Sequence, residues 1–179
     1  MAKYVALLGS INVGGNQLKM AELRAALEEA GFANVATVIA SGNVLFDHSG
    51  APDAKLEERI AKAVKDRFGI ATFACVRSKA ELEAAVEENP FAGQGEDQFV
   101  HVFFLTCQPD RAAFEKLAAD HEGRGPEKLA PGTRALHIHY VDGAGKSKLT
   151  ADFIARRLGC KGTARNVRSI RRMIEAMKG

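Results

Sequence analysis

The first 76 residues alternate between strand-like and helix-like hydrophobic patterns, in the order strand, helix, strand, strand, helix, strand. Runs of apolar and β-branched residues predict strands, and apolar side chains at helical spacing predict helices. The expected strands lie at 3–8, 35–40, 43–47 and 70–76, and the expected helices at 20–30 and 53–68. This order is that of a ferredoxin-like βαββαβ unit, so we expect an α+β protein.

The second half repeats most of this order. Strands are expected at 98–106, 128–130 and 134–141, and helices from Asp110, from Ser147 and from about Asn166. No strand is expected between the last two helices, so the second half is predicted to be βαββαα. We therefore divide the chain into a ferredoxin-like subdomain (1–77), a connecting helix and linker (78–97), and a second α+β subdomain with basic C-terminal helices (98–179).

The cysteine pattern and the hydropathy exclude several protein classes. Cys75, Cys107 and Cys160 are scattered singly, so we expect reduced, packed thiols rather than a disulfide framework or a zinc ribbon. No apolar run reaches the roughly 18 residues of a membrane span. The N-terminus does not resemble a signal peptide, and we expect a cytoplasmic protein.

The net charge of +3 conceals an uneven distribution along the chain. Residues 101–179 carry 15 Lys or Arg against 8 Asp or Glu, whereas residues 1–100 carry 10 against 14. This pattern favours an anionic partner, either a small molecule or nucleic acid, for the C-terminal part. The alternative is that the arginines near the C-terminus form the solvated face of a helix.

A glycine-rich loop follows the first expected strand, in the segment ALLGSINVGGN at 6–16. In a ferredoxin-like unit this loop and the hairpin after the second strand lie at the same end of the sheet. The small polar and glycine residues brought together there are Ser10, Asn12, Gly14, Gly15, Ser41, Gly42 and Asn43. Such residues leave backbone N–H groups accessible to a phosphate, although they can equally serve only to turn the chain. The loop is not a Walker A motif, because Gly15 and Asn16 stand where Lys and a hydroxyl residue are required.

A second phosphate-loop fragment, GAGKS, lies at 143–147 before an expected helix. The first glycine of a complete motif would fall on Tyr140, so Ser147 as an N-cap explains the fragment without a ligand. A helix N-terminus close to Lys148 and Thr150 nevertheless attracts anions.

The histidines give no strong indication of a metal. His137 and His139 share one face of a strand, but no third ligand accompanies them at a fixed spacing. We interpret that face as exposed, and predict no metal and no cofactor. The sequence also lacks a recognisable nucleophile motif.

The segment YVALLGSINVGGNQLKMAELRAALEEAGFANVATVIASGNVLF at 4–46, with NPF at 89–91, SKLT at 147–150 and TARN at 163–166, resembles a bacterial family of unknown function, DUF1697. The resemblance implies an α+β fold with a ferredoxin-like first half and no established activity. The family's motif residues correspond here to Asn12, Gly14, Gly15, Lys19, Ser41, Gly42, Asn43, Ser147, Lys148, Thr150, Arg165 and Asn166. Gly9 and Ser10 replace the family's usual Arg-Gly pair, and Val167 replaces a common aromatic residue.

These observations lead to one main functional hypothesis and two alternatives. The main hypothesis is a cleft that binds a phosphate-bearing ligand, either a nucleotide or nucleic acid, formed by the glycine loop, the Ser41–Asn43 hairpin and the SKLT and TARN segments. The first alternative is a hydrolase or transferase in which Lys148 or Arg165 stabilises charge and Ser41 or Thr150 supplies a hydroxyl. The second alternative is an interaction protein that forms a homodimer.

Overall fold

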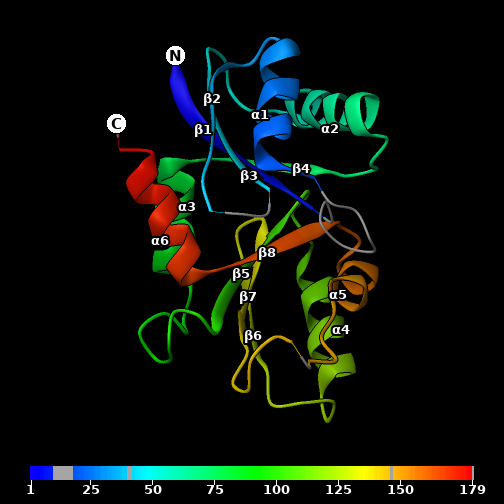
Figure 1. Cartoon of the computed structure of the whole chain (residues 1–179). Coiled ribbons are helices and arrows are strands. Elements are labelled where there is room, and N and C mark those ends of the chain that lie inside the picture. Colours follow the sequence, from blue (N-terminus) through cyan, green and yellow to red (C-terminus); the bar gives the residue numbers. More distant parts are fainter. Residues whose placement is uncertain (10–17, 40–41, 146, 179) are drawn as a thin grey trace. The chain divides into compact units, whose positions relative to one another are not determined.

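Two antiparallel sheets organise the residues that the structure, a computed structural model, describes: 1–9, 18–39, 42–145 and 147–178 (Figure 1). Each sheet lies in its own compact unit, one comprising residues 1–82 and 172–179 and the other residues 83–171. The division expected from the sequence, with boundaries after residues 77 and 97, differs from this one. The first unit extends to residue 82, and it also includes the C-terminal residues 172–179.

The first unit has the element order expected from its hydrophobic pattern. Its elements are β1 (Ala2–Leu8), α1 (Met20–Glu29), β2 (Ala33–Thr37), β3 (Asn43–His48), α2 (Ala54–Phe68) and β4 (Ala74–Ser78). The strands lie in the order β2-β3-β1-β4, and every neighbouring pair is antiparallel. This is the ferredoxin-like arrangement, and the α+β prediction is confirmed.

Both faces of the first sheet are buried, and α1 and α2 cover one of them (Figure 1). On that face Ala6 and Leu8 of β1 pack with Leu23 of α1 and Ile60 of α2. Strand residues alternate between faces, so Val5 belongs to the opposite face, where it is also fully buried.

Local capping interactions mark the ends of the helices that follow β3 and β4. Asp53 caps α2 by accepting a 2.8 Å hydrogen bond from Leu56 N, and Gly69 ends the helix with φ of 70°. The next helix, α3 (Lys79–Glu88), begins with a reciprocal capping box between Ser78 and Glu81.

The second unit contains the same succession of elements. They are β5 (Val100–Leu105), α4 (Arg111–His121), β6 (Lys128–Gly132), β7 (Ala135–His139), α5 (Ala151–Leu158) and β8 (Gly162–Asn166), followed by α6 (Val167–Ala176), whose residues from Arg172 onward belong to the first unit. The strand order β6-β7-β5-β8 reproduces that of the first sheet. Helices α4 and α5 contribute Leu117 and Ile154 to a core with Phe103 and Leu136.

Strand β8 is missing from the sequence-based prediction, which placed two helices in succession. It pairs with β5, from His101 opposite Asn166 to Leu105 opposite Gly162. The segment GTARN has no apolar alternation, and none of its residues is fully buried, so its own side chains do not mark it as a strand. With β8 included, both halves of the chain follow the order βαββαβα.

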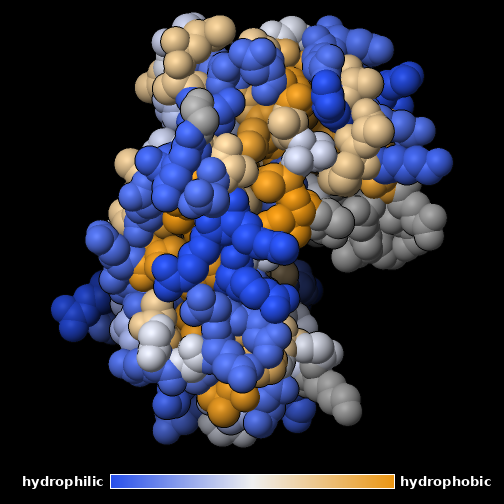
Figure 2. Space-filling view, turned by 60° about the vertical axis from the view of Figure 1, so that its left-hand side comes forward, coloured by the Kyte–Doolittle hydropathy of each residue, from blue (hydrophilic) through white to orange (hydrophobic). Residues whose placement is uncertain are grey.

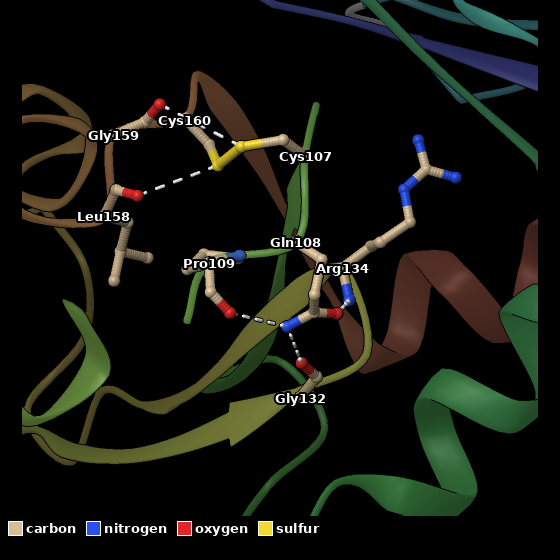
Figure 3. The surroundings of a disulfide bond; sticks show 8 residues. All are labelled: Cys107, Gln108, Pro109, Gly132, Arg134, Leu158, Gly159 and Cys160. Carbon is tan, nitrogen blue, oxygen red and sulfur yellow. Dashed lines mark hydrogen bonds between the residues drawn. A yellow bond between two sulfur atoms is a disulfide. The ribbon is translucent and has the colours of Figure 1, made fainter. Parts of the chain in front are cut away.

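A disulfide joins Cys107 to Cys160, so the prediction of reduced thiols is wrong for these two residues (Figure 3). The ladder between β5 and β8 continues one step beyond the strands, where Thr106 N donates to Lys161 O at 2.9 Å. The next pair in this register is Cys107 and Cys160, whose Cα atoms lie 5.7 Å apart. The pairing was not foreseen because β8 was not recognised. Cys75 lies outside the disulfide and is buried, as expected.

Three further element boundaries differ from the expected ones. The strand expected at 35–40 ends at Thr37, and the strand expected at 70–76 begins only at Ala74. Helix α5 begins at Ala151 with Thr150 as its N-cap, so the prediction that Ser147 caps this helix is wrong.

The uneven charge distribution disappears when charges are counted by structural unit. Residues 83–171 contain 13 Lys or Arg and 12 Asp or Glu, because the acidic segment before β5 belongs to this unit. The face drawn in Figure 2 is mostly hydrophilic, with hydrophobic residues visible in separate groups.

Among the helices of the described residues, none has the length and apolar character needed to cross a membrane.

Candidate functional site

Part of the predicted phosphate site lies outside the described residues. This part comprises Ser10, Asn12, Gly14, Gly15 and Ser41. The remaining predicted residues belong to two different units, so the cleft that was expected to combine them stays a prediction.

Of the three described first-unit residues of the predicted site, Gly42 and Asn43 have structural roles. Gly42 adopts φ of 84°, and its carbonyl accepts a 2.9 Å hydrogen bond from Leu8 N, which extends the pairing of β1 with β3 by one step. Asn43 is buried, and its side-chain amide lies 3.4 Å from Ile39 O. Lys19 is exposed and occupies the N-cap position of α1 without a side-chain capping bond.

Ser147 joins two loops of the second unit. Its hydroxyl donates to Glu127 Oε1 at 2.6 Å and accepts from Leu149 N at 3.0 Å. The hydroxyl is therefore already engaged as both donor and acceptor, which leaves it one remaining acceptor position.

Thr150 and Asn166 both act as helix N-caps. Thr150 Oγ1 accepts from Phe153 N at 3.1 Å at the start of α5, and Asn166 Oδ1 accepts from Ser169 N at 2.8 Å at the start of α6. A capping role accounts for both residues without a ligand. In this arrangement the Thr150 hydroxyl is not paired with a histidine, which is the contact that the hydrolase or transferase alternative needs.

Arg165 lies on β8 and is half-buried. Its Nη1 donates to Thr163 Oγ1 at 2.6 Å and to Ala164 O at 2.9 Å. These short-range bonds fix the guanidinium against its own strand.

Lys148 lines a cavity of about 320 Å³ in the second unit. The loop before β6 and the loop after β7 form this cavity. Arg124, Glu127 and Asp142 also line it. Lys148 and Arg124 are exposed, and neither forms an ion pair with another described residue. Arg124 lies over the Phe153 ring, with its Cζ atom 4.3 Å from the ring centre.

Tyr140, which is buried in the core of the second unit, has a raised pKa. Burial, with a smaller contribution from the negative charge of Glu127, raises the pKa of the Tyr140 phenol to about 12. Tyr140 therefore remains neutral throughout the physiological range.

A second polar cluster, which the sequence did not indicate, forms around Glu88 at the end of α3. Its carboxylate accepts a 2.8 Å hydrogen bond from His137 Nε2, and the backbone N–H and hydroxyl of Thr133 also donate to it. His137 is fully buried, so the prediction that its face of the strand is exposed is wrong. Residues 88 and 137 are far apart in the sequence, and no local pattern connects them.

The protonation states in this cluster follow from burial and hydrogen bonding. Burial lowers the pKa of His137 despite the opposing effect of Glu88, so the imidazole is neutral at pH 7 and Nε2 carries its proton. Burial alone would raise the pKa of the Glu88 carboxyl, but the hydrogen bonds from Thr133 and His137 outweigh it, and the pKa lies below its usual value. The pair therefore consists of an ionised carboxylate and a neutral histidine.

The described residues contain no group of three or more His, Cys, Asp or Glu side chains arranged to hold a metal ion. His137 and His139 share a strand face, but His137 is committed to Glu88, and the His139 ring lies 6.0 Å from that of Phe91.

Comparisons with known proteins identify the family and support the fold. No curated protein matches the chain. A solved structure titled as a conserved bacterial protein, SP0830 from Streptococcus pneumoniae, is 24% identical, with a TM-score of 0.71 over 100% of this chain and 99% of that one. At this identity the likeness supports the fold alone. The family described as "Protein of unknown function (DUF1697)" matches residues 1–137, and the chain belongs to that family.

Proposed function

We propose that this protein binds a small phosphate-bearing ligand, such as a nucleoside monophosphate, in the cavity lined by Arg124 and Lys148. The observation that carries the proposal is that two exposed cations line one cavity of about 320 Å³ and form no ion pair with the described residues around them. A bound phosphate would gain charge-assisted hydrogen bonds from both without breaking an existing salt bridge.

The surrounding backbone adds to this preference for an anion. Helix α5 begins three residues after Lys148, and the N-terminal end of a helix carries a partial positive charge. Gly125 and Gly143 also line the cavity, and glycine allows a ligand to approach the backbone closely.

The carboxylates in the same cavity restrict which anions can bind. Glu127 holds the Ser147 hydroxyl, and Asp142 is exposed in the cavity wall. The two cations and two carboxylates of the cavity wall sum to zero net charge, so each additional phosphate group would meet increasing repulsion from the carboxylates. We therefore favour one phosphate group over a polyphosphate chain, and a small molecule over nucleic acid.

The test is a thermal-shift titration in phosphate-free buffer with AMP as probe and adenosine as its neutral counterpart. A ligand at 100 times its dissociation constant stabilises the folded state by about 2.7 kcal/mol, which is readily measured. We expect AMP to raise the melting temperature and adenosine to leave it unchanged. Lys148→Gln should abolish the effect, whereas Lys128→Gln, on the neighbouring strand β6 but outside the cavity, should retain it.

Two outcomes would contradict the proposal. One is an equal effect of AMP and adenosine, which would show that the phosphate is not recognised. The other is an AMP effect that survives Lys148→Gln, which would place the binding elsewhere. Stabilisation by short oligonucleotides alone, fading as salt is added, would favour nucleic acid instead.

A further inference from the structure

A second and larger cavity, of about 580 Å³, lies in the second unit at the edge of the sheet. Its walls come from the end of α3, from the β5–α4 loop, from α4 and from the end of β6, and they are mainly apolar. The apolar wall residues are Pro109, Phe114, Ala118 and Pro131. A mainly apolar cavity with a few fixed polar groups is the usual form of a small-molecule site.

The charge available inside this cavity is that of Glu88. The side chain is one-third exposed and lines the cavity. Its hydrogen-bond donors are the neutral groups of Thr133 and His137, and none of the described lysines or arginines forms an ion pair with it. The other two charged residues of the wall, Arg111 and Glu115, neutralise each other at 2.9 Å. The cavity therefore presents one uncompensated negative charge.

The wall of the cavity is held in place by a network of hydrogen bonds. Gln108 donates to Pro109 O at 3.1 Å and Gly132 O at 3.4 Å, and accepts from Arg134 N at 2.6 Å, which ties the β5–α4 loop to the β6–β7 hairpin (Figure 3). The disulfide at Cys107 anchors the residue next to Gln108. A cavity held in this way requires little reorganisation on binding.

We propose that this cavity binds a small organic cation, an amine or amidine carried on an apolar or aromatic body, with the cationic group against Glu88 and the body against Phe114 and the two prolines. The cavity walls favour the apolar body, and the fixed carboxylate favours an N–H donor that is positively charged. The inference does not depend on the proposed phosphate site, which is lined by different residues.

The experiment is a titration of isotope-labelled protein with benzamidine, followed by NMR, with benzyl alcohol and benzoate as neutral and anionic counterparts. We expect saturable shifts of the Gln108 side-chain amide with benzamidine, weaker ones with benzyl alcohol and none with benzoate. Glu88→Gln should weaken benzamidine binding at least tenfold.

A cavity-filling variant provides a test that does not alter the Glu88 cluster. Ala118 and Ala119 are both exposed on α4, but only Ala118 lines the cavity. Ala118→Phe should abolish benzamidine binding, and Ala119→Phe should leave it intact. Binding of benzyl alcohol as tightly as benzamidine, or benzamidine binding that is unchanged in Ala118→Phe, would overturn the proposal.

Discussion

Arg77 and Arg165 occupy equivalent positions in the two sheets, each opposite a valine of the central strand and one residue before the N-cap of the following helix. Each donates through Nη1 to the carbonyl of the preceding residue, at 3.0 Å for Arg77 and 2.9 Å for Arg165. The two halves of the chain therefore share a side-chain interaction as well as an element order. Such a correspondence is expected of an internal duplication.

The two arginines differ in burial, and this difference predicts different effects on stability. Arg77 is almost fully buried and lies 3.9 Å from Glu57 Oε2, whereas Arg165 is half-buried. Arg77→Ala would leave a largely buried carboxylate without its cation, and should lower the free energy of unfolding by about 3–5 kcal/mol. Arg165→Ala should cost about 1 kcal/mol. Urea unfolding of both variants gives the comparison, and an equal loss would contradict the argument.

The disulfide should contribute strongly to the stability of the second unit. It closes a loop of sequence separation 53, for which chain-entropy arguments give about 4 kcal/mol as an upper value. Cys160→Ser should therefore lower the free energy of unfolding by about 2–4 kcal/mol. Alkylation of the unfolded protein should label one thiol before reduction and three after it. Labelling of all three before reduction would show that the bridge does not form.

Stability should fall on acidification because His137 is buried in its neutral form. In the folded protein its pKa lies below the ordinary value of 6.5. At a pH between the folded-state pKa and 6.5, the unfolded chain therefore binds more protons than the folded one. The contribution of neutral His137 to the free energy of unfolding is complete above pH 6.5. It decreases as the pH falls, by at most about 1.4 kcal/mol per pH unit for each proton.

Denaturant unfolding at pH 7.5 and 5.5 measures this dependence, to which half-buried His101 also contributes because desolvation lowers its pKa. His137→Gln, which retains an N–H donor for Glu88, should make the pH dependence shallower, and His139→Gln is the matched control. An unchanged slope in His137→Gln would refute the assignment.

Gly132 should not tolerate even a methyl group. A Cβ atom there would lie 2.6 Å from His137 Nε2 and 2.9 Å from Glu88 Oε2, and hydrogen bonds hold both atoms in place. Gly132→Ala should therefore destabilise the protein by about 1–3 kcal/mol. Gly145→Ala, where a Cβ would meet nothing within 4 Å, should have little effect on the melting temperature. Equal melting temperatures for the two variants would show that His137 and Glu88 can move to accommodate a methyl group at little cost in stability.

The sequence by itself determined the ferredoxin-like first half, because its strands and helices are marked by their own side chains. Asp53 and Gly69, for example, act locally, through bonds and backbone angles within a few residues. Such signals can be read without knowledge of the partner elements. The resemblance to the family was carried by local motifs in the same way.

Only the tertiary structure decided the features that depend on pairing between distant segments. Strand β8 forms because its backbone pairs with β5. The register of this pairing also brings Cys107 and Cys160 together for the disulfide. The burial of His137 follows from the meeting of α3 with the β6–β7 hairpin, which brings Glu88 within 2.8 Å of the imidazole. Neither pairing leaves a local pattern, because hydrogen-bond partners and buried charges are chosen by the fold as a whole.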